Sequence, residues 1–301
     1  MLSRRRFLAI SAACCLPVPA LAQELHVATG QALGARVTLR LSHPDAAAIA
    51  ARALAEISRL EQVFSLYRTD SALMRLNASG TLEVPPFELL ECLTLAGAVH
   101  AASGGLFDPT VQPLWALYAE TAVQGRLPTE DERKAALART GWQNLRIGPD
   151  RIALAPGMAL TLNGIAQGYI ADRVAALLEA EGLADILIDT GEFRALGGDP
   201  RGGDWPVHLA EGGQVGLRGR ALATSSPLGT TFDAAGRVGH ILDPRTGTPA
   251  VPVWRAVSIS APSAALADAL STAACLMEVK AGIETLCEKF AETRPESITP
   301  A

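Results

Sequence analysis

The spacing of hydrophobic and polar positions changes several times along the chain, and each change predicts a different element. Leu25–Gln31 and Arg36–Leu41 alternate with a period of two, and glycines bracket the segment between them. This pattern predicts two strands joined by a tight turn. Over Asp45–Phe64 the apolar residues recur every three or four positions, which predicts an amphipathic helix.

The same criteria predict further elements along the rest of the chain. Helices are expected at Ser71–Gly80, Pro86–Ser103, Pro109–Tyr118, from Thr129 onward, and at Gly168–Glu181, Ser263–Met277 and Ile283–Phe290. Strands are expected at Leu145–Ile147, Ile152–Leu154, Ala159–Leu162, Ile186–Asp189, Val207–Ala210, Gln214–Leu217, Ala221–Thr224, Val238–Leu242 and Trp254–Ser260. The polar tail Glu292–Ala301 contains two prolines and is expected to fray.

This order of elements favours an α+β fold, a single domain with an antiparallel sheet and packed helices, over a doubly wound parallel sheet. The 301 residues are 49% hydrophobic and 19% charged, which is a globular composition. Repeats and linker-like stretches are absent from the sequence. Beyond the N-terminus, no apolar run is long enough to predict a membrane span.

The N-terminus has the features of an export signal. Ser3–Leu8 contains paired arginines before an apolar stretch, and Ala20–Ala22 has the form of a cleavage site. We expect a twin-arginine signal peptide at residues 1–22, cleavage near Ala22, and a periplasmic domain of residues 23–301. The alternative is a basic, apolar N-terminus that folds into the body of the protein.

Charge and cysteine content narrow the function classes. The formal net charge is −5, and loss of the arginine-containing leader would make it more negative, which argues against a nucleic-acid partner. A metal–nucleotide ligand is not excluded, because local loops can oppose the overall sign. Outside the leader, Cys92, Cys275 and Cys287 lie far apart, without the spacing of a zinc site, and the first two are expected in the core.

One loop with candidate chemistry joins a predicted strand to a predicted helix at Leu162–Tyr169. Its small residues would let a ligand approach the backbone, and N–H groups at a helix start favour an anion such as phosphate. A tight strand–helix turn without a ligand is the alternative interpretation.

A second candidate lies within a predicted helix. Asp268, Ser271 and Thr272 stand at positions i, i+3 and i+4, so their oxygens share one helix face. A carboxylate with two hydroxyls suits a hard cation such as Mg²⁺. An aspartate that only complements the helix dipole would give the same pattern.

Two further loops complete the set. His240–Gly247 combines a histidine, which titrates near neutrality and could act as a general base, with a turn at Asp243. A structural histidine is the alternative there. In Gly104–Val111, Asp108 stands before Pro109 and is expected to cap a helix, which explains it without a ligand.

Together these blocks resemble the ApbE family of FAD:protein FMN transferases. The resemblance is carried by Glu61–Tyr67 with Ser71 and Leu76–Asn77, Gly105–Leu114, Gly164–Tyr169, His240–Gly247 and Ala267–Thr272, which stand in the family's order. It extends over roughly residues 28–277. The resemblance implies the ApbE-like, T-fold-related α+β fold.

The resemblance also implies a reaction. FAD is cleaved at its pyrophosphate in the presence of Mg²⁺, AMP leaves, and FMN is esterified to a Thr or Ser of an acceptor flavoprotein. By the same resemblance, Asp268, Thr272, the carbonyl of Gly164 and, less directly, Ser271 would hold the metal. His240 is the candidate base. The implied FAD-binding residues are Leu33, Tyr67, Leu106, Phe107, Asp108, Thr161, Gln167 and Ile241.

The sequence departs from the family pattern at several of these positions. Thr161 stands where the family usually has Asp, Asn163 replaces one glycine of a pair, and Gln167 stands where Lys is common. The family's Gly-Gly-Asp after the central strand reads Gly191–Phe193, with a glutamate in the middle.

The details are similar to the branch associated with nitrous oxide reductase maturation, which would make the acceptor a membrane flavoprotein that supplies electrons to that reductase. Three alternatives remain at this stage. The protein could be an FAD carrier, an FAD pyrophosphatase that releases FMN and AMP, or an accessory protein that escorts a partner without catalysis.

Overall fold

The computed structural model describes residues 25–301, so the expected signal peptide and its cleavage site lie outside the described residues. A seven-stranded sheet, with strands in the order β1-β2-β6-β7-β10-β11-β12, is antiparallel throughout. Its strands are β1 (His26–Ala32), β2 (Ala35–Leu41), β6 (Ile186–Asp189), β7 (Phe193–Leu196), β10 (Ala221–Ser225), β11 (Trp254–Ala261) and β12 (Arg294–Pro300). The expected antiparallel sheet is thereby confirmed.

The remaining elements are helices and two small sheets. The helices are α2 (Ala46–Phe64), α3 (Ala72–Ser79), α4 (Phe87–Ala102), α5 (Gln112–Val123), α6 (Glu130–Leu137), α7 (Ala166–Ala180), α8 (Ala264–Ala274) and α9 (Lys280–Glu288), with short 3-10 turns at Pro109–Val111 and Trp142–Asn144. The small sheets contain β3 (Thr81–Glu83), β5 (Arg151–Ala153) and β4 (Arg146–Ile147), and β8 (Trp205–His208) with β9 (Gln214–Leu217). Among the described residues, no helix is both long and apolar enough to cross a membrane.

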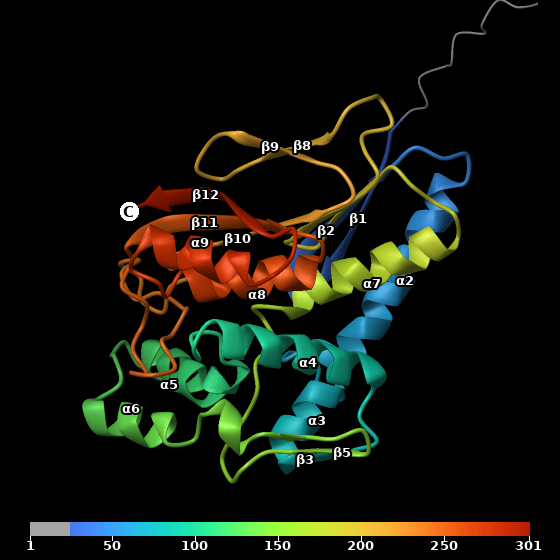
Figure 1. Ribbon diagram of the computed structural model, residues 1–301. Helices are drawn as coiled ribbons and strands as arrows, with labels where there is room; N and C mark the ends of the chain where they lie inside the picture. The colour runs from blue at the N-terminus through green and yellow to red at the C-terminus, as the bar shows by residue number, and fades with distance from the viewer. Residues whose placement is uncertain (1–24) are drawn as a thin grey trace, which may run out of the picture.

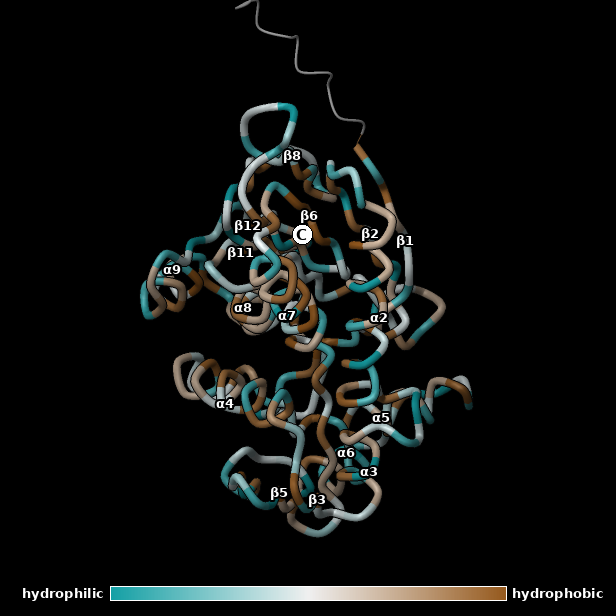
Figure 2. The backbone as a smooth tube through the Cα atoms, turned by 90° about the vertical axis from the view of Figure 1, so that its right-hand side faces the viewer, coloured by the Kyte–Doolittle hydropathy of each residue, from teal (hydrophilic) through white to brown (hydrophobic). Residues whose placement is uncertain are grey.

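The elements form layers on both sides of the large sheet. Helices α7 and α8 lie against one face, the β8–β9 hairpin lies over the other, and α3 to α6 form the lower half of the molecule (Figure 1). Figure 2 shows the same succession of layers from the side. Successive side chains of a strand point to opposite faces of the sheet, so each face packs against a different layer. Ile186 and Ile188 belong to the core on the helix side, whereas Leu187 between them packs with the hairpin around Trp205.

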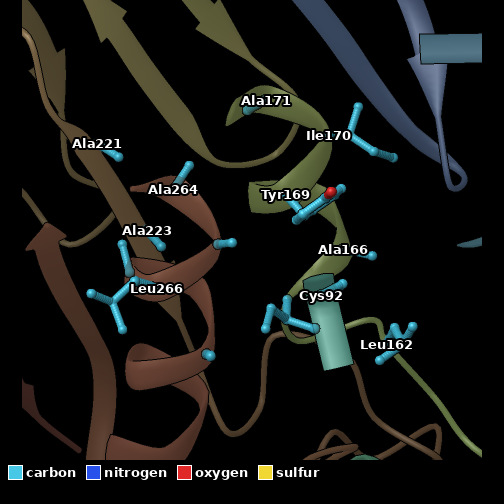
Figure 3. Close-up of a cluster of buried hydrophobic side chains, with 14 of the residues drawn as sticks. Cys92, Leu162, Ala166, Tyr169, Ile170, Ala171, Ala221, Ala223, Ala264 and Leu266 are labelled. Carbon is cyan, nitrogen blue, oxygen red and sulfur yellow. The ribbon is translucent and has the colours of Figure 1, made fainter. Parts of the chain in front are cut away.

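Small residues allow α7 and α8 to lie very close together. A Cβ atom built on Gly168 would stand 2.3 Å from the carbonyl oxygen of Ala264, so only glycine fits this position of α7. Figure 3 shows this packing, with side chains from α7, α8, β10 and α4, labelled Ala166, Tyr169, Ile170, Ala171, Ala264, Leu266, Ala221, Ala223 and Cys92.

The start of α8 is fixed by a side chain of α7. The Asp172 carboxylate accepts hydrogen bonds from the hydroxyl of Ser263 and from the backbone N–H groups of Ala264 and Ala265, at 2.8, 2.8 and 2.9 Å. Arg194 of β7 adds an ion pair at 3.3 Å. Burial raises the pKa of Asp172, although each of these partners favours the charged form. The contact fixes α8 relative to both α7 and the sheet.

Several sequence-based expectations about elements were wrong. The tail does not fray, because Arg294–Pro300 forms β12 and pairs with β11 at the sheet edge. Residues 159–162 are irregular, and residues 238–242 contribute only isolated bridges, Gly239 with Thr231 and Leu242 with Pro249. Strands β3 and β7 were not predicted. The expected burial of Cys92 and Cys275 is confirmed, and both are free thiols.

Candidate active site

A pocket of about 370 Å³ opens where the N-terminus of α7, the inner face of α8, the end of β10 and the loop after β10 meet. This volume falls in the range of small-molecule and cofactor sites. Most of the residues implied by the family resemblance line it, although they are spread over more than 160 positions of the sequence. They are Leu106, Phe107, Asp108, Thr161, Gly164, Gln167, His240, Ile241, Asp268 and Thr272.

Two buried carboxylates face this pocket. Asp268 is 3% exposed, and its only hydrogen bond in the described residues is a long one of 3.4 Å from the backbone N–H of Gly168. Burial therefore raises its pKa to about 8. Glu192, directly before β7, is 8% exposed, and burial together with the nearby Asp268 charge raises its pKa well above the usual value.

Three hydroxyl groups lie close together near Asp268 on α8 and at the end of β10. The Ser225 hydroxyl at the end of β10 lies 2.7 Å from that of Ser271 and 3.3 Å from that of Thr272. A Cβ atom on Gly164 would lie 3.0 Å from the Thr272 hydroxyl, so any larger residue would press on this group. Ser271 is fully buried behind the pocket wall and donates to the carbonyl of Asp268, so it supports the site and does not line it.

The residues present fit a hard divalent cation. In the described chain, His, Cys, Asp and Glu do not gather in a group of three that could hold a metal, so a cation here would depend on oxygen donors of mixed type. Asp268, Thr272 and the Gly164 backbone supply such oxygens within one small region. Lys and Arg are absent from the described residues that line the pocket, so the buried acids have no cationic side chain beside them.

His240 is held in a form suited to accept a proton. Its Nδ1 lies 3.0 Å from the carbonyl oxygen of Thr230, which is an acceptor only, so Nδ1 carries the hydrogen and Nε2 keeps its lone pair. Burial lowers the pKa of His240, and the bond to Thr230 opposes this only in part. The ring lines the pocket as a neutral imidazole at neutral pH.

The expected capping role of Asp108 is confirmed. One carboxylate oxygen accepts from the backbone and hydroxyl of Thr110 at 2.9 and 2.7 Å, and the other accepts from the N–H of Trp142 at 3.3 Å. These bonds hold the pocket wall formed by Leu106 and Phe107, two apolar residues that are almost fully buried. Asp108 itself also lines the pocket.

Two of the residues implied as FAD-binding lie away from the pocket lining. Leu33 occupies the turn between β1 and β2, where its N–H donates to Glu61 at 2.8 Å. Tyr67 lies beside the same turn, 3.6 Å from a Cβ built on Gly34, and is 71% exposed. The structure brings these two side chains to one region, but not to the carboxylate–hydroxyl cluster formed by Asp268, Thr272 and Ser225.

Sequence reasoning missed two polar residues of the site. Glu192 was noticed only as a departure from the family's glycine-rich turn, and Ser225 follows a predicted strand without any motif. Both positions acquire meaning only when the sheet brings the ends of β7 and β10 beside α8. For Glu192, the departure from the family's Gly-Gly-Asp was the one signal that the sequence offered.

Comparison with known sequences shows a consistent set of relatives. The model of the ApbE family matches residues 33–293. An FAD:protein FMN transferase of Treponema pallidum is 34% identical over 264 residues, covering 78% of this chain and 72% of that protein. The transferase of Salmonella typhimurium is 31% identical over 230 residues, covering 70% of this chain but slightly under two thirds, 65%, of its own length.

Solved structures with the same fold agree with the sequence relatives. The ApbE protein of Thermotoga maritima superimposes with a TM-score of 0.82 at 27% identity, covering 92% of this chain and 97% of that one. The apo flavinyl transferase ApbE of Pseudomonas stutzeri gives a TM-score of 0.78 at 29% identity, covering 92% and 95%. With a family match over most of its length and relatives above 30% identity, this chain belongs to the ApbE family.

Proposed function

We propose that this protein is a Mg²⁺-dependent FAD:protein FMN transferase, which moves FMN from FAD to a Thr or Ser of an acceptor flavoprotein and releases AMP. One observation carries the proposal. A single pocket holds a neutral histidine beside a buried carboxylate–hydroxyl cluster of the kind that binds a hard cation. Membership of the ApbE family and the names of its relatives support the same activity.

The chain's residues divide the work of this reaction. Asp268, Thr272 and the Gly164 carbonyl would hold Mg²⁺, which when bound neutralises phosphate charge as the pyrophosphate bond breaks. The apolar wall of Phe107 and Ile241 would exclude water from this region, since both are nearly buried.

His240 supplies the proton acceptor. Its Nε2 would take the proton from the acceptor hydroxyl as that oxygen forms its bond to the FMN phosphorus. The bond from that phosphorus to the bridging oxygen breaks at the same time, and its electron pair leaves with AMP. The Thr230 carbonyl stabilises the transient imidazolium through Nδ1.

Export and the acceptor are part of the same proposal. The twin-arginine pattern and the Ala20–Ala22 cleavage motif support a periplasmic enzyme. The resemblance to the nitrous oxide reductase branch supports a membrane flavoprotein that donates electrons to that reductase as the acceptor.

The proposal is tested with residues 23–301, FAD, Mg²⁺ and an acceptor domain that carries a candidate Thr. In-gel flavin fluorescence on the acceptor and AMP in solution are expected, and both are lost when that Thr is changed to Val. FMN and AMP without a labelled acceptor would identify a pyrophosphatase. FAD that is bound but stays intact would identify a carrier, and either result would overturn the transferase.

A further inference from the structure

Glu192 occupies an unusual place in the pocket. It stands directly after the β6–β7 turn, is 8% exposed, and lines the same pocket as Asp268. One carboxylate oxygen accepts a hydrogen bond of 3.2 Å from the backbone N–H of Thr224. The other oxygen has no hydrogen-bond donor among the described residues. A nine-tenths buried carboxylate therefore has one oxygen committed to the fold and one left for the pocket.

Asp268 lines the same pocket and is also buried with few hydrogen-bond partners. It is 97% buried, and the only donor to its carboxylate within residues 25–301, the N–H of Gly168, is distant at 3.4 Å. The two carboxylates are near enough for the charge of Asp268 to act on Glu192. Asp189 adds a further like charge, although Arg36 and Arg40 act on Asp189 itself, and no Lys or Arg is among the described residues that line the pocket. Two buried carboxyl groups without a cationic partner can both ionise only at a high cost, so the pair points to a positive ligand.

We propose that Glu192 is a second carboxylate ligand of the divalent cation bound by Asp268, and that the two acids hold this cation before FAD arrives. The inference rests on the proposed function, since it concerns the same cation. Two carboxylates and the hydroxyls of Thr272 and Ser225 form an oxygen set that suits Mg²⁺ or Mn²⁺. When ionised, the glutamate also supplies a negative charge that would attract a cation. Position 167 of the pocket is the neutral Gln167, so no lysine there would oppose that attraction.

The test uses Mn²⁺ as the probe, without FAD, on residues 23–301. Free Mn²⁺ is measured by its electron paramagnetic resonance signal during titration. Glu192→Gln is the informative variant because the amide oxygen can still accept from Thr224 while the negative charge is lost. We expect it to weaken Mn²⁺ binding by about tenfold or more, and Glu192→Asp to recover part of the affinity.

Asp199→Asn is the matched control. Asp199 is also largely buried, at 7% exposure, but it pairs with Arg201 outside the pocket, so Mn²⁺ affinity should not change. Thermal unfolding supplies a second measurement. Without Mn²⁺, Glu192→Gln should unfold at the same or a higher temperature than the wild type, because an ionisable group buried without a cationic partner is replaced by a neutral amide. The rise in unfolding temperature on adding Mn²⁺ should shrink.

Three results would overturn the inference. Unchanged Mn²⁺ affinity in Glu192→Gln would show that the glutamate is not a ligand. Loss of stability in the same variant without Mn²⁺ would give Glu192 a structural role. Absence of Mn²⁺ binding by the wild type without FAD would refute a cation held in advance. Each of these leaves flavin transfer to the acceptor untouched, which is measured separately, so failure here is distinguishable from failure of the proposed function.

Discussion

At the residue scale, burial decides what the polar groups of the pocket can do. Asp268 was identified from sequence because its oxygens share a helix face with two hydroxyls, and that spacing depends only on helix geometry. Glu192 escaped because its neighbour Asp268 is far away along the chain. Local patterns therefore predicted the part of the site contained within one helix, and the part assembled by the sheet required coordinates.

The first prediction concerns the carboxylate on α8. Asp268→Asn should lower the Mg²⁺-dependent release of AMP from FAD by about a hundredfold or more, because the main charged ligand is lost and metal stabilisation is worth several kcal/mol. Circular dichroism should remain native, since the only hydrogen bond to the side chain from residues 25–301 is long. Near-normal AMP release with a native spectrum would contradict the metal assignment.

The second prediction concerns the histidine. His240→Ala should slow transfer by about 10²- to 10⁴-fold while FAD affinity, measured by fluorescence titration, stays close to that of the wild type. If FAD affinity fell in parallel with the rate, His240 would be a ligand contact and not a base.

The pH dependence of the wild type gives the third prediction. The base is active when neutral, and burial holds the pKa of His240 below its usual 6.5. Transfer activity should therefore be retained as the pH falls through 6.5 and be lost only at lower pH. The acidic limb of the single-turnover rate measures this, and its disappearance in His240→Ala is the control. A limb centred above 6.5 that disappears in His240→Ala would contradict the assignment.

At the scale of elements, the contact between α7 and α8 positions the site. The two helices carry Gln167, Asp268 and Thr272, and the start of α8 is fixed by Asp172. The sequence predicted both helices from their periodicity, but not that a glycine allows them to touch. That property depends on the carbonyl of Ala264, which lies across the contact.

A pair of glycine substitutions tests this contact, and it forms the fourth prediction. Gly168→Ala should destabilise the protein by about 1–3 kcal/mol, because its Cβ would meet the Ala264 carbonyl. Gly282→Ala in α9 is the matched control. Its Cβ meets only Met277 at 3.8 Å, so the better helix propensity of alanine should stabilise by about 0.5–1 kcal/mol. Urea unfolding measures both free energies of unfolding. If both substitutions stabilised the protein, or both destabilised it, the close contact would be contradicted.

At the scale of the whole molecule, the least predictable feature is how the sheet ends. The alternation of β1 and β2 was recognised, and in β2 the residues Val37, Leu39 and Leu41 on one side of the strand belong to the core. β12 was not recognised, because Pro295 and Pro300 are typical of a chain end. Prolines are tolerated at a sheet edge, where a missing N–H deprives no neighbouring strand of a hydrogen bond. Residues 159–162 show the opposite error: they were predicted as a strand from their sequence, but they pair with no strand and are irregular.

The edge strand leads to the last prediction. β12 pairs along β11, and the hydroxyl of Ser260 donates to Glu296 beside it. β11 in turn packs against α8, which carries Asp268. Deleting residues 294–301 would expose the whole edge of β11 to solvent and to other chains. We expect a lower unfolding temperature and concentration-dependent aggregation, which light scattering would measure.

A chain lacking only Ala301 is the control, since it loses a single hydrogen bond to Val253 and should remain monodisperse. If the longer deletion left stability unchanged, the strand would be an accessory to the sheet. If stability fell while Mn²⁺ affinity persisted, Asp268 and Glu192 would keep their positions without support from β12.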